Sequence, residues 1–578
     1  MKAKYHSIKI IACVSIVVLL MIGTLTACGG GEATQIPDLK QAGAGEDATP
    51  ESVVQEQPTA EQPDSDQSNI KQAQGGNGAS DSGFRPDPNG FGFENYGNDG
   101  GIVNLTPAEI RRMFGDKVCA ATQGDSCTLI PPAQQYMEQL NVSMKNGHCE
   151  GMAVLSDIFF SGKGDPGKFG ASVVKDLKLQ GNEVLQREIA YWYTTQITSP
   201  ADQAKIAGTP GDVVDILTKA FSDPANAELY TIGFYKPDKT GGHAMTPYAV
   251  VDKGNGIYWI MVYDNNYPGK EMNIEVDKNA NTWQYAGATM SGMEKDIYKG
   301  DAFTKTLELT PLSPRMDQQI CDFCNAPQSS KGRGLAAEKP KTNQIWMEGE
   351  ARLLLMDEKG RKFGYEGDKF LREIPEAEMD SLFTARVGDA NPIYYLPFGM
   401  KFSAIIDGKQ VDKKNPVDLV VIGPGYYIGV EEITMEANQK DQANFDGSGK
   451  YLAYKTASNE TPVLIFGIET PQYDYELEVK ANDVKAGIET IIEYDAAKGT
   501  LALHSSSNEE GVYYIALHRI DDNGVQSYES PEAGITLLPK DTIHFNLKDW
   551  AGQGKALKVL LDHGSNGEID EEKDIEGK

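Results

Sequence analysis

The sequence predicts an α+β fold followed by an all-β region, and two observations predict it. Between residues 101 and 315, segments with helical spacing of apolar residues come first, and alternating strands follow them. Beyond residue 342, short alternating segments are separated by Asp, Gly, Asn and Pro turns, which is typical of sandwich modules. We therefore expect an α+β domain over residues 101–315 and a β-sandwich region of one or two modules over 343–578.

The first 27 residues have the pattern of a signal peptide. Three lysines precede the apolar run Ile10–Leu25, which is short of the ~20 residues that a spanning helix needs. The tetrapeptide Leu25-Thr26-Ala27-Cys28 then resembles the lipobox of bacterial lipoproteins. That resemblance implies cleavage before Cys28 and a lipid on its sulfur. The alternative is an ordinary signal peptide that is cut after a small residue.

Residues 28 to 100 are expected to form a disordered tether. Residues 29–83 contain no aromatic residue and are rich in Gly, Gln, Ser, Pro, Glu and Asp. Such a segment cannot bury enough apolar surface to offset its loss of entropy on ordering. Together with the lipid on Cys28, the tether predicts a protein anchored to the cell membrane on its extracytoplasmic face.

The net charge of the chain is −30, which argues against nucleic acid as a partner. The expected partners are instead the membrane, through the N-terminal lipid, and a peptide or protein substrate. The oligomeric state is left open.

The α+β region divides into a helical half and a strand half. Thr106, Pro107 and Glu109 form a capped helix start, and the strands lead into a hairpin turn at 253–256. The expected helices are 106–114, 132–140, a helix opened by Cys149, 183–197 and 213–221, and the expected strands are 229–235, 245–251 and 257–263.

The seven cysteines sort by position. Cys13 leaves with the signal peptide and Cys28 carries lipid. Outside the cytoplasm, the close pairs Cys119 with Cys127 and Cys321 with Cys324 are candidate disulfides, and Cys149 remains as the odd thiol. A zinc site built from both pairs is the alternative, but no histidine lies nearby.

The acidic segment 562–573 matches a calcium loop only in part. We therefore expect neither a metal nor another cofactor.

Residues 316–342 are expected to be a polar linker that carries the Cys-x-x-Cys pair. The β region beyond it includes expected strands at 351–356, 393–396, 419–422, 463–468, 473–479, 512–518 and 556–561. Its histidines are scattered without ligand spacing. The sequence names no ligand for this region.

The candidate catalytic residues are Cys149, His243 and Asp264. Cys149 opens an apolar helix, where the helix dipole and free N–H groups favour the thiolate. His243 begins a strand, and Asp264 closes the next strand after a hairpin. The hairpin should bring His243 and Asp264 together, with the Nδ1–H group of the imidazole donating to the carboxylate. His148 should point away from the neighbouring thiol.

These motifs resemble the papain-like cysteine peptidase superfamily, and most closely the bacterial group that includes bacteriocin-leader peptidases. The residues that carry the resemblance are Gly147-His148-Cys149, Gly242-His243-Ala244 and Tyr263-Asp264. It implies a papain-like domain over 101–315 that cleaves a peptide or amide bond through a Cys-His-Asp triad. Papain relatives carry a glutamine about six residues before the cysteine to bind the oxyanion, and Ser143 stands there in this chain. Gln135, Gln139 and Asn141 lie near that position, but none matches by spacing.

Three alternatives remain open at this stage. The first is a surface adhesin with an inactive papain-like scaffold. The second is a transglutaminase-like acyl transferase, which shares the order Cys, His, Asp; its histidine is usually followed by an aromatic and an acidic residue, whereas Ala244 and Met245 follow His243. In the third, Asp264 only forms its turn, and Asn265 or Asn266 orients the histidine.

Overall fold

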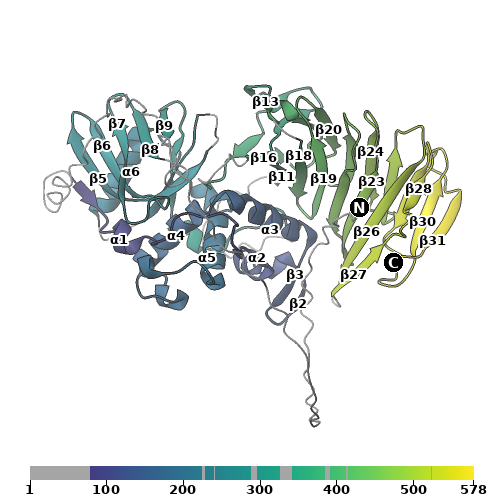
Figure 1. The fold of residues 1–578 in the computed structure, drawn as a ribbon, viewed down its shortest axis with the longest axis horizontal. Coiled ribbons are helices and arrows are strands. Elements are labelled where there is room, and N and C mark those ends of the chain that lie inside the picture. Colours follow the sequence, from purple (N-terminus) through teal and green to yellow (C-terminus); the bar gives the residue numbers. More distant parts are fainter. Residues whose placement is uncertain are drawn as a thin grey trace, which may run out of the picture. The chain divides into compact units, whose positions relative to one another are not determined.

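The computed structural model describes residues 79–223, 228–237, 239, 241–287, 296–325, 341–384, 391–411, 414–521 and 524–578 (Figure 1). The chain divides into the units 1–68 and 69–578, and the described residues all belong to the second. The predicted signal peptide, the lipobox with Cys28 and most of the tether lie outside the described residues. The described part is an α+β structure with antiparallel sheets, as the sequence predicts. Its helices include none long and apolar enough to cross a membrane.

The helices gather in the first half of the described chain. They are α1 (Pro86–Asn89), α2 (Pro107–Phe114), α3 (Pro131–Ser143), α4 (Cys149–Phe160), α5 (Glu183–Thr194) and α6 (Pro210–Ser222). The capping box of Thr106 and Glu109 opens α2 as predicted, and a second box of Thr209 and Asp212 opens α6. Gly151 lets α4 approach α5 closely, because a Cβ atom there would lie 2.1 Å from the carbonyl oxygen of Ile189.

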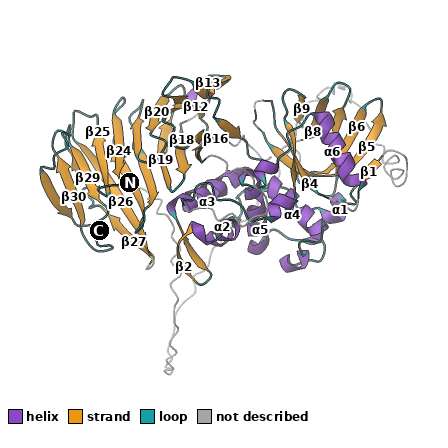
Figure 2. Ribbon diagram, turned by 180° about the vertical axis from the view of Figure 1, so that it is seen from behind, coloured by secondary structure: helices purple, strands orange, loops and turns teal. Residues whose placement is uncertain are grey.

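An antiparallel sheet follows the helices and has the order β10-β4-β5-β6-β7-β8-β9, with β1 beside β5. Its strands are β1 (Ala79–Asp81), β4 (Tyr230–Phe234), β5 (His243–Gly254), β6 (Ile257–Tyr263), β7 (Glu271–Asp277), β8 (Thr282–Gly287), β9 (Asp296–Asp301) and β10 (Leu307–Pro311). Helix α6 packs Val213, Leu217 and Phe221 against this sheet (Figure 2). The three predicted strands are therefore confirmed, and the sheet is larger than the sequence indicated.

The predicted tether is wrong for residues 79–100. Strand β1 pairs with β5, and the segment after it buries Phe84, Phe91 and Tyr96. Phe84 packs on Tyr248 and Tyr263 of the sheet, whereas Phe91 and Tyr96 belong to the helical core. The aromatic rings supply the buried apolar area that residues 29–83 lack, so the folded part begins before the predicted boundary at residue 101.

Both predicted disulfides are present. Cys119–Cys127 joins the hairpin strands β2 (Cys119–Gln123) and β3 (Ser126–Leu129), and Cys321–Cys324 closes a short loop. Their sulfurs are therefore bonded to one another and do not form a zinc site. The predicted linker is wrong for residues 316–325, because the second disulfide is buried and the ring of Phe323 packs on that of Tyr136, with the ring centres 4.6 Å apart. Residues 326–340 lie outside the described ranges.

The all-β region is a sandwich of two antiparallel sheets. The ten-stranded sheet contains β11 (Thr342–Glu348), β15 (Glu378–Asp380), β16 (Ile393–Pro397), β18 (Asn415–Gly423), β19 (Tyr426–Met435), β22 (Val463–Glu469), β23 (Asp474–Asn482), β26 (Gly511–Asp521), β27 (Gly524–Glu529) and β28 (Ile535–Leu537). The eleven-stranded sheet contains β12 (Arg352–Asp357), β13 (Lys362–Glu366), β14 (Lys369–Arg372), β17 (Phe402–Asp407), β20 (Lys440–Phe445), β21 (Tyr451–Lys455), β24 (Glu489–Asp495), β25 (Thr500–Ser505), β29 (Thr542–Asn546), β30 (Leu557–Asp562) and β31 (Glu571–Ile575).

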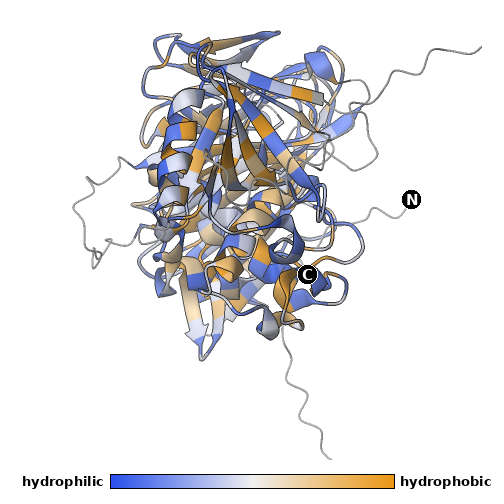
Figure 3. Cartoon of the chain, turned by 90° about the vertical axis from the view of Figure 1, so that its left-hand side faces the viewer, coloured by the Kyte–Doolittle hydropathy of each residue, from blue (hydrophilic) through white to orange (hydrophobic). Residues whose placement is uncertain are grey.

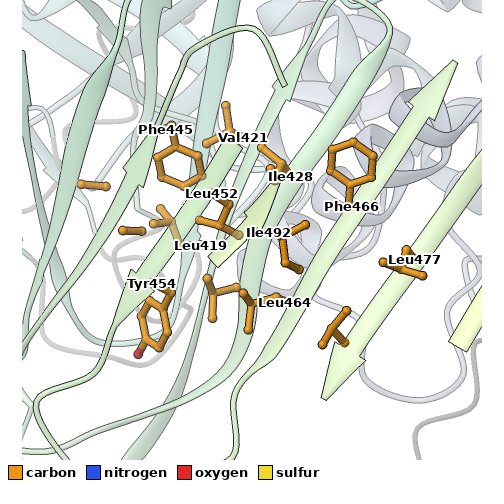
Figure 4. Close-up of a cluster of buried hydrophobic side chains, with 14 of the residues drawn as sticks. Leu419, Val421, Ile428, Phe445, Leu452, Tyr454, Leu464, Phe466, Leu477 and Ile492 are labelled. Carbon is orange, nitrogen blue, oxygen red and sulfur yellow. The ribbon is translucent and has the colours of Figure 1, made fainter. Parts of the chain in front are cut away.

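From β18 onward, successive hairpins alternate between the two sheets. The β18–β19 and β22–β23 hairpins belong to one sheet, and the β20–β21 and β24–β25 hairpins belong to the other. Their inward side chains form one hydrophobic cluster that runs from Ile345 to Val559 (Figure 4). Hydropathy colouring shows hydrophobic and hydrophilic residues alternating along many elements (Figure 3). The sandwich therefore has a single continuous core.

The outer face of the ten-stranded sheet packs against α3. The rings of Tyr136 and Trp346 meet edge to face at 6.2 Å, and Val420, Tyr427 and Ile465 belong to the same hydrophobic cluster as the helices. The helical part and the sandwich therefore share a core rather than being joined only by a linker.

This contact surface also buries carboxyl groups, which predicts that stability falls as the pH rises. Burial, with the charges of Glu138 and Glu478, raises the pKa of Glu476 to about 8. Between the ordinary glutamate pKa of about 4.3 and this value, the folded chain binds a proton that the unfolded chain releases. The free energy of unfolding should therefore fall by up to about 1.4 kcal/mol per pH unit for this group.

Thermal unfolding between pH 5 and 9 measures this effect. In Glu476→Gln, Tm should decrease less steeply as the pH rises, because the amide of glutamine does not titrate. The exposed Glu358 is the matched control, with 69% of its side chain accessible, and Glu358→Gln should leave the slope unchanged. Equal slopes for the Glu476→Gln variant and the wild type would contradict the prediction.

Candidate active site

Cys149 is the first residue of α4, and Gly147 turns the chain into this helix. Gly147 has a φ of 129°, which favours glycine. Among the cysteines that the structure describes, Cys149 is the unpaired one, and it is fully buried. Burial raises the pKa of its thiol well above the ordinary value, although the backbone N–H groups of Ala244 and Glu150 act in the opposite direction. Desolvation by the surrounding side chains therefore acts against the thiolate that the start of α4 favours.

His243 and Asp264 are brought together by the β5–β6 hairpin, as predicted. The Nε2 atom of His243 lies 2.8 Å from Oδ1 of Asp264, and both side chains are buried. The prediction that Nδ1 contacts the carboxylate is wrong. Within the described ranges, Nδ1 has no hydrogen-bond partner. The imidazole is thus held through one nitrogen, and the other remains available to exchange a proton.

Asp264 is held as a carboxylate by a set of donors. Burial raises its pKa, but the charge and hydrogen bond of His243, with the Tyr285 hydroxyl and the Asn266 backbone N–H, lower it below the ordinary value. Asp264 also forms its turn, because the Tyr267 N–H donates to its carbonyl oxygen at 2.9 Å. The turn and the orienting contact therefore occur in the same residue. No pattern in the sequence predicted the hydrogen bond that Tyr285, on β8, donates to Asp264.

Asn265 connects the start of α4 to the start of β5. Its Nδ2 donates to the carbonyl oxygen of Cys149 at 2.9 Å and to that of Ala244 at 3.2 Å. Since Ala244 follows His243 directly, this side chain fixes the start of α4 beside the start of β5. Asn265 therefore acts on backbone positions. The side-chain contact to His243 comes from Asp264 rather than from Asn265.

His148 is bonded away from the thiol. Its Nδ1 lies 2.7 Å from the carbonyl oxygen of Tyr96, its Nε2 lies 2.9 Å from Oδ1 of Asn104, and its ring stacks on Tyr96. Both ring nitrogens of His148 are thus engaged by groups other than the Cys149 thiol.

Asn95 supplies an amide at the start of α4. Its Oδ1 accepts from the His148 N–H at 2.7 Å, and its backbone N–H donates to Asn265. Its Nδ2 donates to the carbonyl oxygen of Thr384 at 2.8 Å. By contrast, the side chain of Asn141 forms hydrogen bonds with the backbone of Leu105, and the hydroxyl of Ser143 donates to a carbonyl oxygen of its own helix. Asn95 thus contacts the backbone of the residue before Cys149, and its distance from Cys149 in the sequence concealed it.

A buried ion pair supports the start of α4. Glu150 accepts a short hydrogen bond from Arg315, and the two side chains are 1% and 0% exposed. Arg315 also donates to Thr195 at 2.6 Å and to Thr231 at 3.0 Å. These contacts join α4 to β4 and to the end of α5, so they fix the residue that follows Cys149.

The segment Ser381–Thr384, which comes after β15 in the sandwich region, lies across the site. The Thr384 N–H donates to the carbonyl oxygen of Gly242 at 3.1 Å, and the Phe383 N–H donates to Gln196 at 2.7 Å. Phe383 stacks on Tyr235 with the ring centres 4.7 Å apart and packs in one buried cluster with Cys149 and Ala244. This contribution of the β region to the site was absent from the sequence-based prediction.

Comparison of the chain with protein-family models, with curated proteins and with solved structures gives no match. Within the described ranges, no group of three or more His, Cys, Asp or Glu residues is arranged to hold a metal ion. The interpretation of the site therefore depends on its own geometry.

Proposed function

We propose that the protein is a papain-like cysteine hydrolase that cleaves peptide or amide bonds. Cys149 is the nucleophile, His243 the general base and acid, and Asp264 the residue that orients the imidazole. One observation carries the proposal. A buried His–Asp pair leaves Nδ1 of the histidine unpaired, and its strand is tied by Asn265 to the helix that begins with Cys149.

The proposed reaction begins with proton transfer from the Cys149 thiol to Nδ1 of His243. The thiolate then attacks the carbonyl carbon, and the oxyanion accepts a hydrogen bond from Asn95 Nδ2. The imidazolium returns its proton to the leaving amine as the C–N bond breaks, which gives a thioester on Cys149. Water, deprotonated by His243, hydrolyses the thioester and restores the thiol. Asp264 accepts from the Nε2–H group throughout and stabilises the imidazolium.

The test is digestion of a defined peptide mixture by the full chain, with the cut sites identified by mass spectrometry. Wild type and Phe383→Ala should produce the same set of cuts, and Cys149→Ala should produce none. Cuts that Cys149→Ala also produces, or the absence of cuts from both the wild type and Phe383→Ala, would refute the hydrolase. Products in which the acyl group has moved to an added amine would instead indicate an acyl transferase.

We also propose that a lipid on Cys28 anchors the chain to the membrane. The lipobox-like Leu25-Thr26-Ala27-Cys28 and the tether that follows support this, although Cys28 lies outside the described residues. Cys28→Ala should move the protein from the membrane fraction to the soluble fraction. Unchanged membrane retention of the variant would exclude the lipid as the anchor.

A further inference from the structure

The backbone of Ser381–Thr384 passes between the two glycines that precede the proposed catalytic residues. On one side, the Thr384 N–H donates to the carbonyl oxygen of Gly242, the residue before His243. On the other side, the Thr384 carbonyl oxygen would lie 1.9 Å from a Cβ on Gly147, which is two residues before Cys149. Only glycine at position 147 leaves room for this approach.

The carbonyl group of Thr384 is held by the amide that we assign to the oxyanion. Asn95 Nδ2 donates to it at 2.8 Å, and the same Asn95 is fixed by the His148 N–H. A substrate carbonyl under attack by Cys149 needs such a donor at the start of α4. The segment therefore presents a backbone carbonyl to the group that would receive the carbonyl of a substrate.

The side chain of Phe383 packs among residues from the start of α4, the end of β4 and the start of β5. Its ring stacks on Tyr235 and packs with Ala244 and Cys149. Gly233 forms the floor, because a Cβ there would lie 2.2 Å from the Cζ atom of Phe383. The pocket is thus shaped for an aromatic ring and has no room for a side chain at position 233.

Three further contacts secure the segment. The Phe383 N–H donates to Gln196, the Ser381 hydroxyl donates to the carbonyl oxygen of Lys239, and the Tyr235 hydroxyl donates to Ser381. They come from the helical half and from the connection between β4 and β5. The segment is bound by side chains and backbone of the site, as a ligand is.

We infer that Ser381–Thr384 is a built-in ligand of the cleft, which occupies the position of the acyl side of a peptide substrate and covers Cys149. The inference rests on the proposed function and specifies its substrate class. The cleft takes an extended peptide with an aromatic residue directly before the residue whose carbonyl is attacked. Such a peptide competes with the segment for the same contacts, so access to Cys149 depends on displacement of Phe383.

Alkylation of Cys149 by iodoacetamide in the folded full chain tests the inference. Phe383→Ala should raise the alkylation rate roughly tenfold or more, because a buried aromatic ring that holds the segment is lost. Phe398→Ala, which changes an exposed phenylalanine of the sandwich, is the matched control and should leave the rate unchanged. An unchanged rate in Phe383→Ala would overturn the inference.

A second measurement examines the pocket itself. In Phe383→Ala, an acetylated Ser-Leu-Phe-Thr peptide should slow alkylation, and Ser-Leu-Ala-Thr should not. Gly233→Ala should also speed alkylation, but its filled pocket should prevent protection by either peptide. Equal protection by both peptides would overturn the inference, as would self-cleavage after Thr384, which would make the segment a substrate.

Alkylation reports access to the thiol and requires no turnover. Failure of the proposed function would appear differently, as the absence of Cys149-dependent peptide cleavage even when Phe383→Ala exposes the site. The two failures are therefore distinguishable.

Discussion

Replacement of His243 by alanine is expected to lower kcat/KM by about 10²- to 10⁴-fold for any peptide that the protein cleaves. In the proposed mechanism, Nδ1 of His243 both accepts the thiol proton and supplies the proton of the leaving amine. Burial raises the pKa of the Cys149 thiol, so removal of the proton acceptor should slow formation of the thiolate. Cys149→Ala should abolish turnover.

Asp264→Ala should be the milder of the catalytic variants. It removes the acceptor of Nε2 and the anion that stabilises the imidazolium, but it leaves Nδ1 and the thiol in place. A measurable residue of activity should remain, and the loss should be smaller than that of His243→Ala. The variants are compared by steady-state kinetics on one cleaved peptide. Each of them also carries Phe383→Ala, so that the peptide has equal access to the site in all of them.

His563→Ala is the matched control for this series, because His563 is partly exposed on the sandwich and also contacts an aspartate, Asp541. It should have the activity of the parent. If His243→Ala keeps the parental rate, or if His563→Ala loses it, the assignment of the base fails.

Replacement of Arg315 by alanine is expected to destabilise the start of α4 by about 3–5 kcal/mol. The substitution leaves Glu150 buried without its cation and removes the donors to Thr195 and Thr231. Hydrogen–deuterium exchange of peptides that cover α4 measures the free energy of local opening. Because Glu150 follows Cys149, the same variant should also lower activity.

A double substitution tests whether the unpaired charge of Glu150 causes the loss of stability. Glu150→Gln combined with Arg315→Met removes both charges at similar volume and should recover much of the lost stability. The exposed pair Lys498–Asp495 is the control, and Lys498→Ala should change stability by no more than about 1 kcal/mol. Exchange in α4 that is as slow in Arg315→Ala as in the wild type would contradict the prediction.

Local chemistry made several features predictable from the sequence. The capping boxes and apolar spacing placed the helices, since the first turn of a helix must satisfy its own N–H groups. Alternation and the turn at 253–256 placed the β5–β6 hairpin, and the hairpin alone brings Asp264 to His243. Close spacing paired Cys119 with Cys127 and Cys321 with Cys324, which left Cys149 unpaired.

Other features depend on residues far apart in the chain, and no local pattern encodes them. Asn95 reaches the start of α4 because aromatic residues between 84 and 96 fold a segment whose composition otherwise resembles a tether. Tyr285 reaches Asp264 from β8, and Arg315 reaches Glu150 from beyond the sheet. Each contact forms only when the sheet and the helices pack.

The sequence by itself determined the candidate nucleophile, base and acid, because each occupies a helix start or a strand end that short patterns specify. Only the tertiary structure decided how the site is completed and covered. Burial of Cys149 raises the pKa of its thiol, the Nε2 atom of His243 rather than Nδ1 contacts the carboxylate, and Phe383 of the sandwich region belongs to the same buried cluster as Cys149. Desolvation and packing depend on everything that surrounds a side chain, and those surroundings come from the whole folded chain.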